Sequence, residues 1–341
     1  DPYRFFLAQQ AWTNPDLYSW NFFLPGALML EGALVSGCHA SLVCTRMVHG
    51  VLAVASLALV YDTARQLKAG RGYALASVLL LAAMPLYVFT FLSFLAQMWL
   101  AFLVTLALNA MVRGSLTVTV VIVSLMPLVR PEGIFVVFAL AVYLLRGRNY
   151  GLIVLLMVPG FVYLLWLIWA LPDMATYTEW RREFREKSYE AIPGLEAPPI
   201  WGMFTTLNPF FWCGSVAGLV WSASRSLRVF TGSALAWIVF YATLIELELA
   251  AYVGYYVLFV IPFLALGLAY TLEWGCSRGH GTWPARTACA VFVVFLLGEH
   301  LLQSDVIRNI TGIRDRWPIP GPEHAQQRLE KTGRKELNAR N

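Results

Sequence analysis

Long apolar segments alternate along the chain with short segments that carry arginine or lysine. Residues 72–112 hold no charged side chain, and this stretch is about twice the length that a helix needs to cross a bilayer. It predicts a hairpin of two spans with a turn near residues 91–97. Shorter apolar runs predict further spans at residues 43–60, 116–128, 134–145, 152–171, 210–223, 229–244, 252–272 and 288–302.

The composition indicates that lipid is the solvent of this chain. Hydrophobic residues make up 59% of the 341 residues, charged residues only 13%, and the mean hydropathy is +0.62. These values lie outside the usual range of soluble chains. Residues 21–37 are also apolar, but Pro25, Gly26 and Glu31 interrupt them, so we expect an interfacial helix there. The predicted fold class is an all-α polytopic membrane protein with about ten transmembrane helices plus interfacial helices.

Basic residues between the apolar runs predict which loops face the cytoplasm. They put residues 130–133 and the long polar segment 173–208 outside. The cytoplasmic set is Arg65, Lys68, Arg71, Arg113, Arg146, Arg148, Arg225 and Arg228. The predicted organisation is an external loop with interfacial helices (1–42), a transmembrane core (43–172), an external loop (173–208), C-terminal transmembrane helices (209–302) and a polar tail (303–341).

Charge and motifs exclude several function classes. The net charge of +5 is scattered over loops and forms no basic face, which argues against nucleic acid as a partner. The sequence contains no HExxH, GxSxG, Walker or Rossmann pattern in a suitable context. The cysteines show neither CxxC spacing nor a framework of close pairs, so we interpret them as small residues packed between helices. They are Cys38, Cys44, Cys213, Cys276 and Cys289.

Ionisable and polar side chains gather at the outer face under this topology, where they suit a binding or catalytic site. Carboxylates there are suited to general-base work or metal binding, and arginine forks to a phosphate. The set comprises Asp1, Tyr3, Arg4, Asp16, Glu31, Arg46, His49, Gln97, Arg130, Glu132, residues 180–187, Glu246 and Glu248.

Simpler interpretations exist for several of these residues. Arg130 and Glu132 also fit a tight-turn pair that reaches the lipid headgroups, and residues 180–187 fit a surface helix lying on lipid. Tyr255 and its neighbours fit an aromatic belt. His49, alone on an apolar helix, is more typical of a structural histidine.

Four segments together resemble the GT-C superfamily of polytopic glycosyltransferases, such as protein mannosyltransferases and the aminoarabinose transferase. They are Asp1-Pro2-Tyr3-Arg4 before an interfacial segment, Phe94-Leu95-Ala96-Gln97 at an outer turn, Pro127-Leu128-Val129-Arg130-Pro131-Glu132-Gly133, and the late stretch 255–263. The resemblance covers most of residues 1–272 and makes residues 43–172 a GT-C-like core.

The resemblance implies transfer of a sugar from a polyprenyl-phosphate donor to a glycan, lipid or protein acceptor at the outer face of a bacterial or archaeal cytoplasmic membrane. It implies that Asp1 is the catalytic base and that one more span precedes Asp1. The implied substrate-binding residues are Arg4, Arg46, Gln97, Arg130, Glu132, Arg181 and Tyr255, with Arg130 on the carrier's phosphate. Gln97 stands where the family often has an acid. Because glutamine cannot take a proton, both a second carboxylate role and a bound divalent metal stay open at this position. No cofactor is implied with certainty.

Two other classes of protein are weighed against the enzyme. A transporter or lipid flippase predicts paired charges near the bilayer midplane and repeat symmetry, and the sequence shows neither. A non-catalytic membrane subunit remains open, because Gln97 is compatible with a site that has lost activity.

Overall fold

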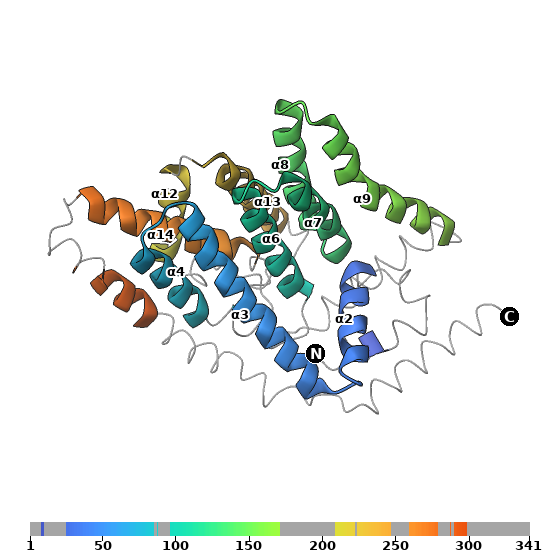
Figure 1. Cartoon of the computed structure of the whole chain (residues 1–341), viewed down its shortest axis with the longest axis horizontal. Coiled ribbons are helices and arrows are strands. Elements are labelled where there is room, and N and C mark those ends of the chain that lie inside the picture. Colours follow the sequence, from blue (N-terminus) through green and yellow to red (C-terminus); the bar gives the residue numbers. More distant parts are fainter. Residues whose placement is uncertain are drawn as a thin grey trace.

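The structure is a computed structural model that describes residues 8–9, 25–84, 87, 96–170, 209–221, 224–246, 259–278, 287 and 290–298. Every regular element within these ranges is helical (Figure 1). The helices are α2 (Pro25–Gly37), α3 (Leu42–Gln66), α4 (Arg71–Ala83), α6 (Ala96–Val112), α7 (Leu116–Val129), α8 (Gly133–Arg146), α9 (Tyr150–Ala170), α12 (Pro209–Trp221), α13 (Arg225–Glu246) and α14 (Ile261–Arg278). Residues 290–298 are helical as well.

The predicted all-α class is confirmed for the described residues. The stretch 72–112, expected as a hairpin of two spans, contains α4 and α6, which each pack against α3. The stretches 116–128 and 134–145, also expected as spans, correspond to α7 and α8. Within the described ranges two helices are both long and apolar enough to cross a bilayer, α3 and residues 226–244 of α13. The other apolar helices are shorter, and α7, with 14 residues, rises only about 21 Å. The number of crossings therefore stays a prediction.

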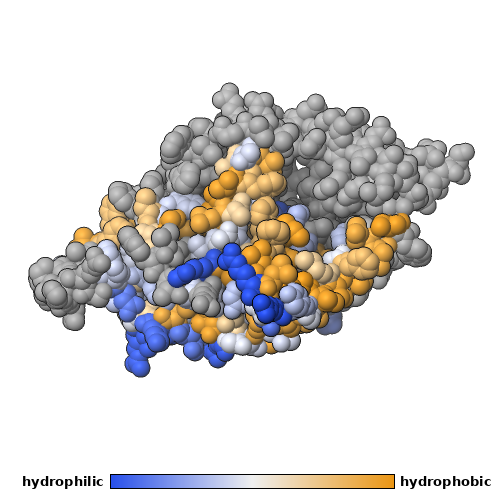
Figure 2. All heavy atoms as spheres, turned by 90° about the horizontal axis from the view of Figure 1, so that it is seen from above, coloured by the Kyte–Doolittle hydropathy of each residue, from blue (hydrophilic) through white to orange (hydrophobic). Residues whose placement is uncertain are grey.

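The outer surface of α3 shows why this fold needs lipid. Val43, Met47, Val51 and Val54 form an exposed apolar stripe along the helix, each about two-thirds exposed. The opposite face buries polar side chains, namely Thr45, His49, Ser56 and Thr63. Figure 2 shows apolar atoms over much of the described surface in that view. Water would make such a surface costly, so this arrangement indicates an integral membrane protein.

Side-chain contacts fix how the helices run relative to one another. The Tyr270 hydroxyl of α14 donates to the Leu67 carbonyl at 2.5 Å, which places the second half of α14 beside the α3–α4 turn. Near the start of α8, Phe135 contacts Phe240 in the second half of α13, with ring centroids 5.3 Å apart. Helices α8 and α13 are therefore antiparallel, and α13 begins at the end of the bundle where α8 stops.

Helices α12 and α14 cross at small residues. A Cβ added to Gly218 of α12 would lie 1.6 Å from the Gly267 carbonyl oxygen of α14, so only glycine fits there. One turn earlier, the Thr271 hydroxyl donates to the Gly214 carbonyl. The pair Gly214 and Gly218 is a small-xxx-small motif, which lets helices in lipid approach closely enough for van der Waals packing.

The two ends of α7 offer a matched test of the predicted topology. Ser115 and Pro131 are both exposed and flank this helix. With cysteines other than Cys38 and Cys44 replaced, Pro131→Cys should react with a membrane-impermeant maleimide in intact cells. Ser115→Cys should react only after permeabilisation, because basic residues keep its end in the cytoplasm. The reverse pattern would put the predicted outer residues on the cytoplasmic side.

Candidate active site

A buried polar cluster lies where α2, α3 and α6 meet. The Trp99 indole N–H donates to Oε1 of Glu31 at 2.7 Å, and Nε2 of His49 lies 3.2 Å from Oε2 of the same carboxylate. Glu31 is 8% exposed and His49 is fully buried. The His49 ring also meets Trp99 edge to face, with centroids 6.3 Å apart. The three residues, called here the Glu31 cluster, enclose one carboxylate whose Oε1 accepts a hydrogen bond and whose Oε2 lies beside the His49 ring.

Close packing of α2 against α7 positions this cluster. A Cβ added to Gly26 would lie 2.8 Å from the Leu128 carbonyl oxygen, so the glycine permits backbone contact between the two helices. Ala27, Ala96 and Val129 then form a small buried apolar cluster at this junction. Three separate helices thus converge on one apolar contact.

In each of the three segments, a polar residue comes shortly after the apolar contact residue along the chain. Glu31 lies about one turn beyond Ala27 on α2, Gln97 directly follows Ala96, and Arg130 directly follows Val129. The structure therefore brings Glu31, Gln97 and Arg130 to the same end of the bundle.

Gln97 was predicted at an external turn, but it lies in the first turn of α6 and is only 3% exposed. Neither its Oε1 nor its Nε2 has a hydrogen-bond partner among the described residues. The helix begins at Ala96 and turns this side chain inward. A buried primary amide offers both a donor and an acceptor to a hydroxyl-bearing ligand.

Arg130 and Glu132 form a fork at the turn between α7 and α8. Nε of Arg130 donates to Oε2 of Glu132 at 3.1 Å, and Nη2 donates to Oε1 at 2.6 Å. Glu132 is buried at 4% exposure. Gly133 is needed beside this pair, because a Cβ there would lie 2.6 Å from the Met126 carbonyl carbon. The bidentate pairing fixes the plane of the guanidinium.

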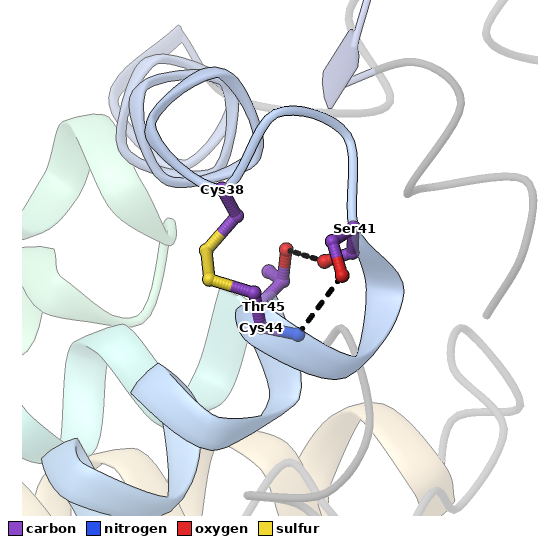
Figure 3. Close-up of a disulfide and its surroundings, with 4 residues drawn as sticks. All are labelled: Cys38, Ser41, Cys44 and Thr45. Carbon is purple, nitrogen blue, oxygen red and sulfur yellow. Dashed lines mark hydrogen bonds between the residues drawn. A yellow bond between two sulfur atoms is a disulfide. The ribbon is translucent and has the colours of Figure 1, made fainter.

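A disulfide joins Cys38 and Cys44 across the α2–α3 turn, with Cα atoms 5.6 Å apart (Figure 3). Our interpretation of these two cysteines as packing residues was therefore wrong. His39 and Ala40 take left-handed backbone conformations, with φ of 49° and 57°, and close the turn. Of the other described cysteines, Cys276 is buried, whereas Cys213 is exposed. Cys289 lies outside the described residues.

Figure 3 also shows how the α2–α3 turn is capped. The Ser41 hydroxyl accepts a hydrogen bond from the Cys44 amide at 3.3 Å, and the Thr45 hydroxyl donates to the Ser41 carbonyl at 2.8 Å. Ser41 is the N-cap of α3, which satisfies amide groups that the first helical turn leaves open. The disulfide and the cap together fix the start of the helix that carries His49.

The other predicted site residues have different outcomes. Arg46 is exposed near the start of α3. Asp1, Arg4, Arg181 and Tyr255 lie outside the described residues, so their roles stay predictions. No group of three or more histidine, cysteine or acidic side chains suited to a metal occurs within the part of the chain that the structure describes.

Sequence reasoning missed the pairing in the Glu31 cluster. His49 was interpreted as a lone structural histidine, but it faces Glu31. The available signal was one carboxylate and one histidine, each isolated in an apolar segment. Such groups are costly at membrane depth unless they meet a partner. The partner could not be identified, because 18 positions separate the two residues.

Comparison with known proteins gives a limited result. No family model matches the chain, and no curated protein matches it in sequence. Among solved structures, the chain has a match to the crystal structure of ArnT from Cupriavidus metallidurans in the apo state, with a TM-score of 0.46 and 17% identity. The match covers 76% of this chain and 51% of ArnT, so the chain spans about half the length of that protein.

Proposed function

We propose that this chain is a GT-C glycosyltransferase that moves a sugar from a polyprenyl-phosphate donor to an acceptor at the extracytoplasmic face. The observation that carries the proposal is the convergence of two buried carboxylates, a guanidinium and a buried amide at one end of an apolar helical bundle. A polyprenyl-phosphate sugar has its reactive carbon at the headgroup plane. An enzyme acting on it needs its polar groups just outside the hydrocarbon.

The disulfide supports the sidedness of this proposal. Disulfides form and persist mainly in oxidising compartments such as the bacterial periplasm. Cys38 and Cys44 bridge the turn that follows Glu31 and precedes His49. The Glu31 cluster is therefore best assigned to the outer side, in agreement with the basic residues of the opposite loops.

Each group has a distinct role in the proposed transfer. Asp1 takes the proton from the acceptor hydroxyl while the acceptor oxygen bonds to the anomeric carbon and the bond from that carbon to the phosphate oxygen breaks. Arg130 stabilises the departing phosphate, with its guanidinium oriented by Glu132. Gln97 supplies a donor and an acceptor to sugar hydroxyls. A single displacement of this kind inverts the anomeric centre.

Glu31 is a candidate for the second carboxylate that the Gln97 position lacks. Gln97 leaves the first turn of α6 without a carboxylate, but Trp99 on the same helix holds the carboxylate of Glu31 from α2. The Glu31 carboxylate accepts the Trp99 N–H, lies beside His49 and is buried in the bundle, which suits an electrostatic or positioning role better than proton transfer from the acceptor. The proposed site thus contains a second carboxylate in addition to Asp1.

The proposal is tested by turnover. The full chain, purified and reconstituted in lipid vesicles, receives a labelled polyprenyl-phosphate sugar together with glycan, lipid or protein acceptors. We expect labelled sugar on an acceptor and release of polyprenyl phosphate in equal amounts. Donor binding without transfer to any acceptor would instead identify a non-catalytic membrane subunit. Movement of an intact solute or lipid across the vesicle would identify a transporter.

Arg130→Lys tests the phosphate role separately. Lysine keeps the charge but cannot form the two-pronged pairing with Glu132 or with a phosphate. We expect about tenfold weaker binding of the polyprenyl-phosphate donor, measured by titration of the reconstituted chain. Arg148→Lys, in the exposed turn between α8 and α9, is the matched control and should leave donor binding unchanged. Equal binding by the Arg130 variant would make Arg130 a headgroup anchor.

A further inference from the structure

A groove of about 680 Å³ runs along α8 and α13, from Phe135 near the start of α8 to the end of α8 that lies farthest from the Arg130 turn. Phe138 and Val142 of α8 form one wall, and Gly232 and Ala236 of α13 lie across from them. Arg146, in the last turn of α8, and Arg228, in the first turn of α13, line the groove at that end. Phe138 is 71% exposed, so the apolar part of the groove opens towards the lipid.

The sequences of the two helices explain the shape and the charge of this groove. Phe138, Val142 and Arg146 follow one another at intervals of four along α8, which aligns them on one face. Arg228, Gly232 and Ala236 do the same along α13. Because the helices are antiparallel, the stripe on α8 ends in arginine where the stripe on α13 begins with arginine.

Gly232 is the position where the groove is open. A Cβ added there meets no atom within 4 Å, in contrast to the close packing at Gly218 and Gly133. Gly232 and Ala236 thus leave space along α13 that larger side chains would fill. The groove thus combines an apolar part, called here the trough, with two guanidiniums at one end.

We propose that this groove binds one anionic phospholipid of the cytoplasmic leaflet. Its phosphate lies between Arg146 and Arg228, and an acyl chain lies along Phe138, Val142, Gly232 and Ala236. Basic pockets between helices on the cytoplasmic side are suited to anionic headgroups, and arginine favours phosphate oxygens. A soluble anion would use the two arginines but leave the trough uncovered, whereas a lipid matches both parts.

This site is independent of the proposed glycosyl transfer. The donor phosphate is assigned to Arg130, and Arg130 and Arg146 lie at opposite ends of α8. Turnover can therefore fail while the lipid site is confirmed, and the lipid site can fail while turnover is retained.

The test is native mass spectrometry of the full chain released from detergent. The chain is titrated with phosphatidylglycerol or with phosphatidylcholine of the same acyl chains. We expect one preferentially retained phosphatidylglycerol, which inorganic phosphate in excess does not displace. Arg146→Gln and Arg228→Gln should each weaken its binding about fivefold. Arg148→Gln removes the same charge from the same side and should have no effect.

Filling the trough gives a second measurement. Gly232→Leu places a side chain in the open space and should abolish preferential retention. Gly160→Leu, at an exposed position of α9 with similar open space, should not. Unfolding temperatures close to the wild-type value identify variants that keep the fold. Equal retention of phosphatidylcholine, retention by Gly232→Leu, or no lipid on the wild-type chain would each overturn the proposal. The last result would point to another segment or a second copy in the groove.

Discussion

Asp1→Asn should lower the rate of sugar transfer by about 10²- to 10⁴-fold, which is the usual contribution of a general base. Asparagine keeps the shape of aspartate but cannot accept the proton of the acceptor hydroxyl. Asp1 precedes an aromatic and cationic segment, Tyr3 to Phe6, which suits a position at the membrane interface near a lipid-borne sugar. Donor binding should be unchanged, because the donor is held by its phosphate and lipid. The measurement is single-turnover transfer with reconstituted full-length chain.

The transfer rate of Glu31→Gln should be compared with that of Asp1→Asn, because the comparison shows which carboxylate is the base. Glu31 is buried, accepts a hydrogen bond from Trp99 and lies beside His49, so its loss should lower the rate less than the loss of Asp1. If Glu31→Gln has the larger effect and Asp1→Asn transfers at the wild-type rate, the base is Glu31 and His49 assists it. An unchanged rate in both variants, and in Asp16→Asn and Glu132→Gln, would show that none of these four carboxylates is the base.

Gly218→Ala should destabilise the fold by about 3 kcal/mol, the upper end of the usual cost of overpacking. The added methyl group meets the Gly267 carbonyl oxygen, and a backbone atom cannot turn aside as a side chain can. The helices α12 and α14 must separate, which also strains the hydrogen bond from Thr271 to Gly214. We expect a lower midpoint of thermal unfolding in detergent and a lower yield of folded chain.

Gly160→Ala is the matched control for this measurement. Gly160 lies in α9, where an added Cβ meets nothing within 4 Å. The same chemical change should therefore be neutral or stabilise the helix by up to about 1 kcal/mol, through the higher helix propensity of alanine. If both variants lose stability equally, the close approach of α12 and α14 is not the cause of the loss in Gly218→Ala.

The turn between α7 and α8 could be predicted from the sequence because its determinants are local. Pro131 and Gly133 interrupt two apolar runs, and Arg130 and Glu132 are two positions apart, so their pairing needs no distant contact. Because this turn lies at the candidate site, it also places Arg130 and Glu132 there.

The Glu31 cluster could not be predicted, since its members meet only when α2 packs on α7 and α3 packs on α6. Nothing local to Glu31 selects His49 or Trp99 as its neighbour. The disulfide was missed for a related reason. Its turn uses left-handed conformations at His39 and Ala40, residue types that do not mark such a turn as glycine would.

The bond between Cys38 and Cys44 also bears on how the protein is made. Thiols stay reduced in the cytosol, so the proposed outer position of the α2–α3 turn implies that the covalent ring closes only after this turn has been translocated. Glu31 and His49 lie on the two arms that this ring joins. The covalent constraint on the Glu31 cluster is therefore absent until the turn reaches the oxidising compartment in which the proposed acceptor is present.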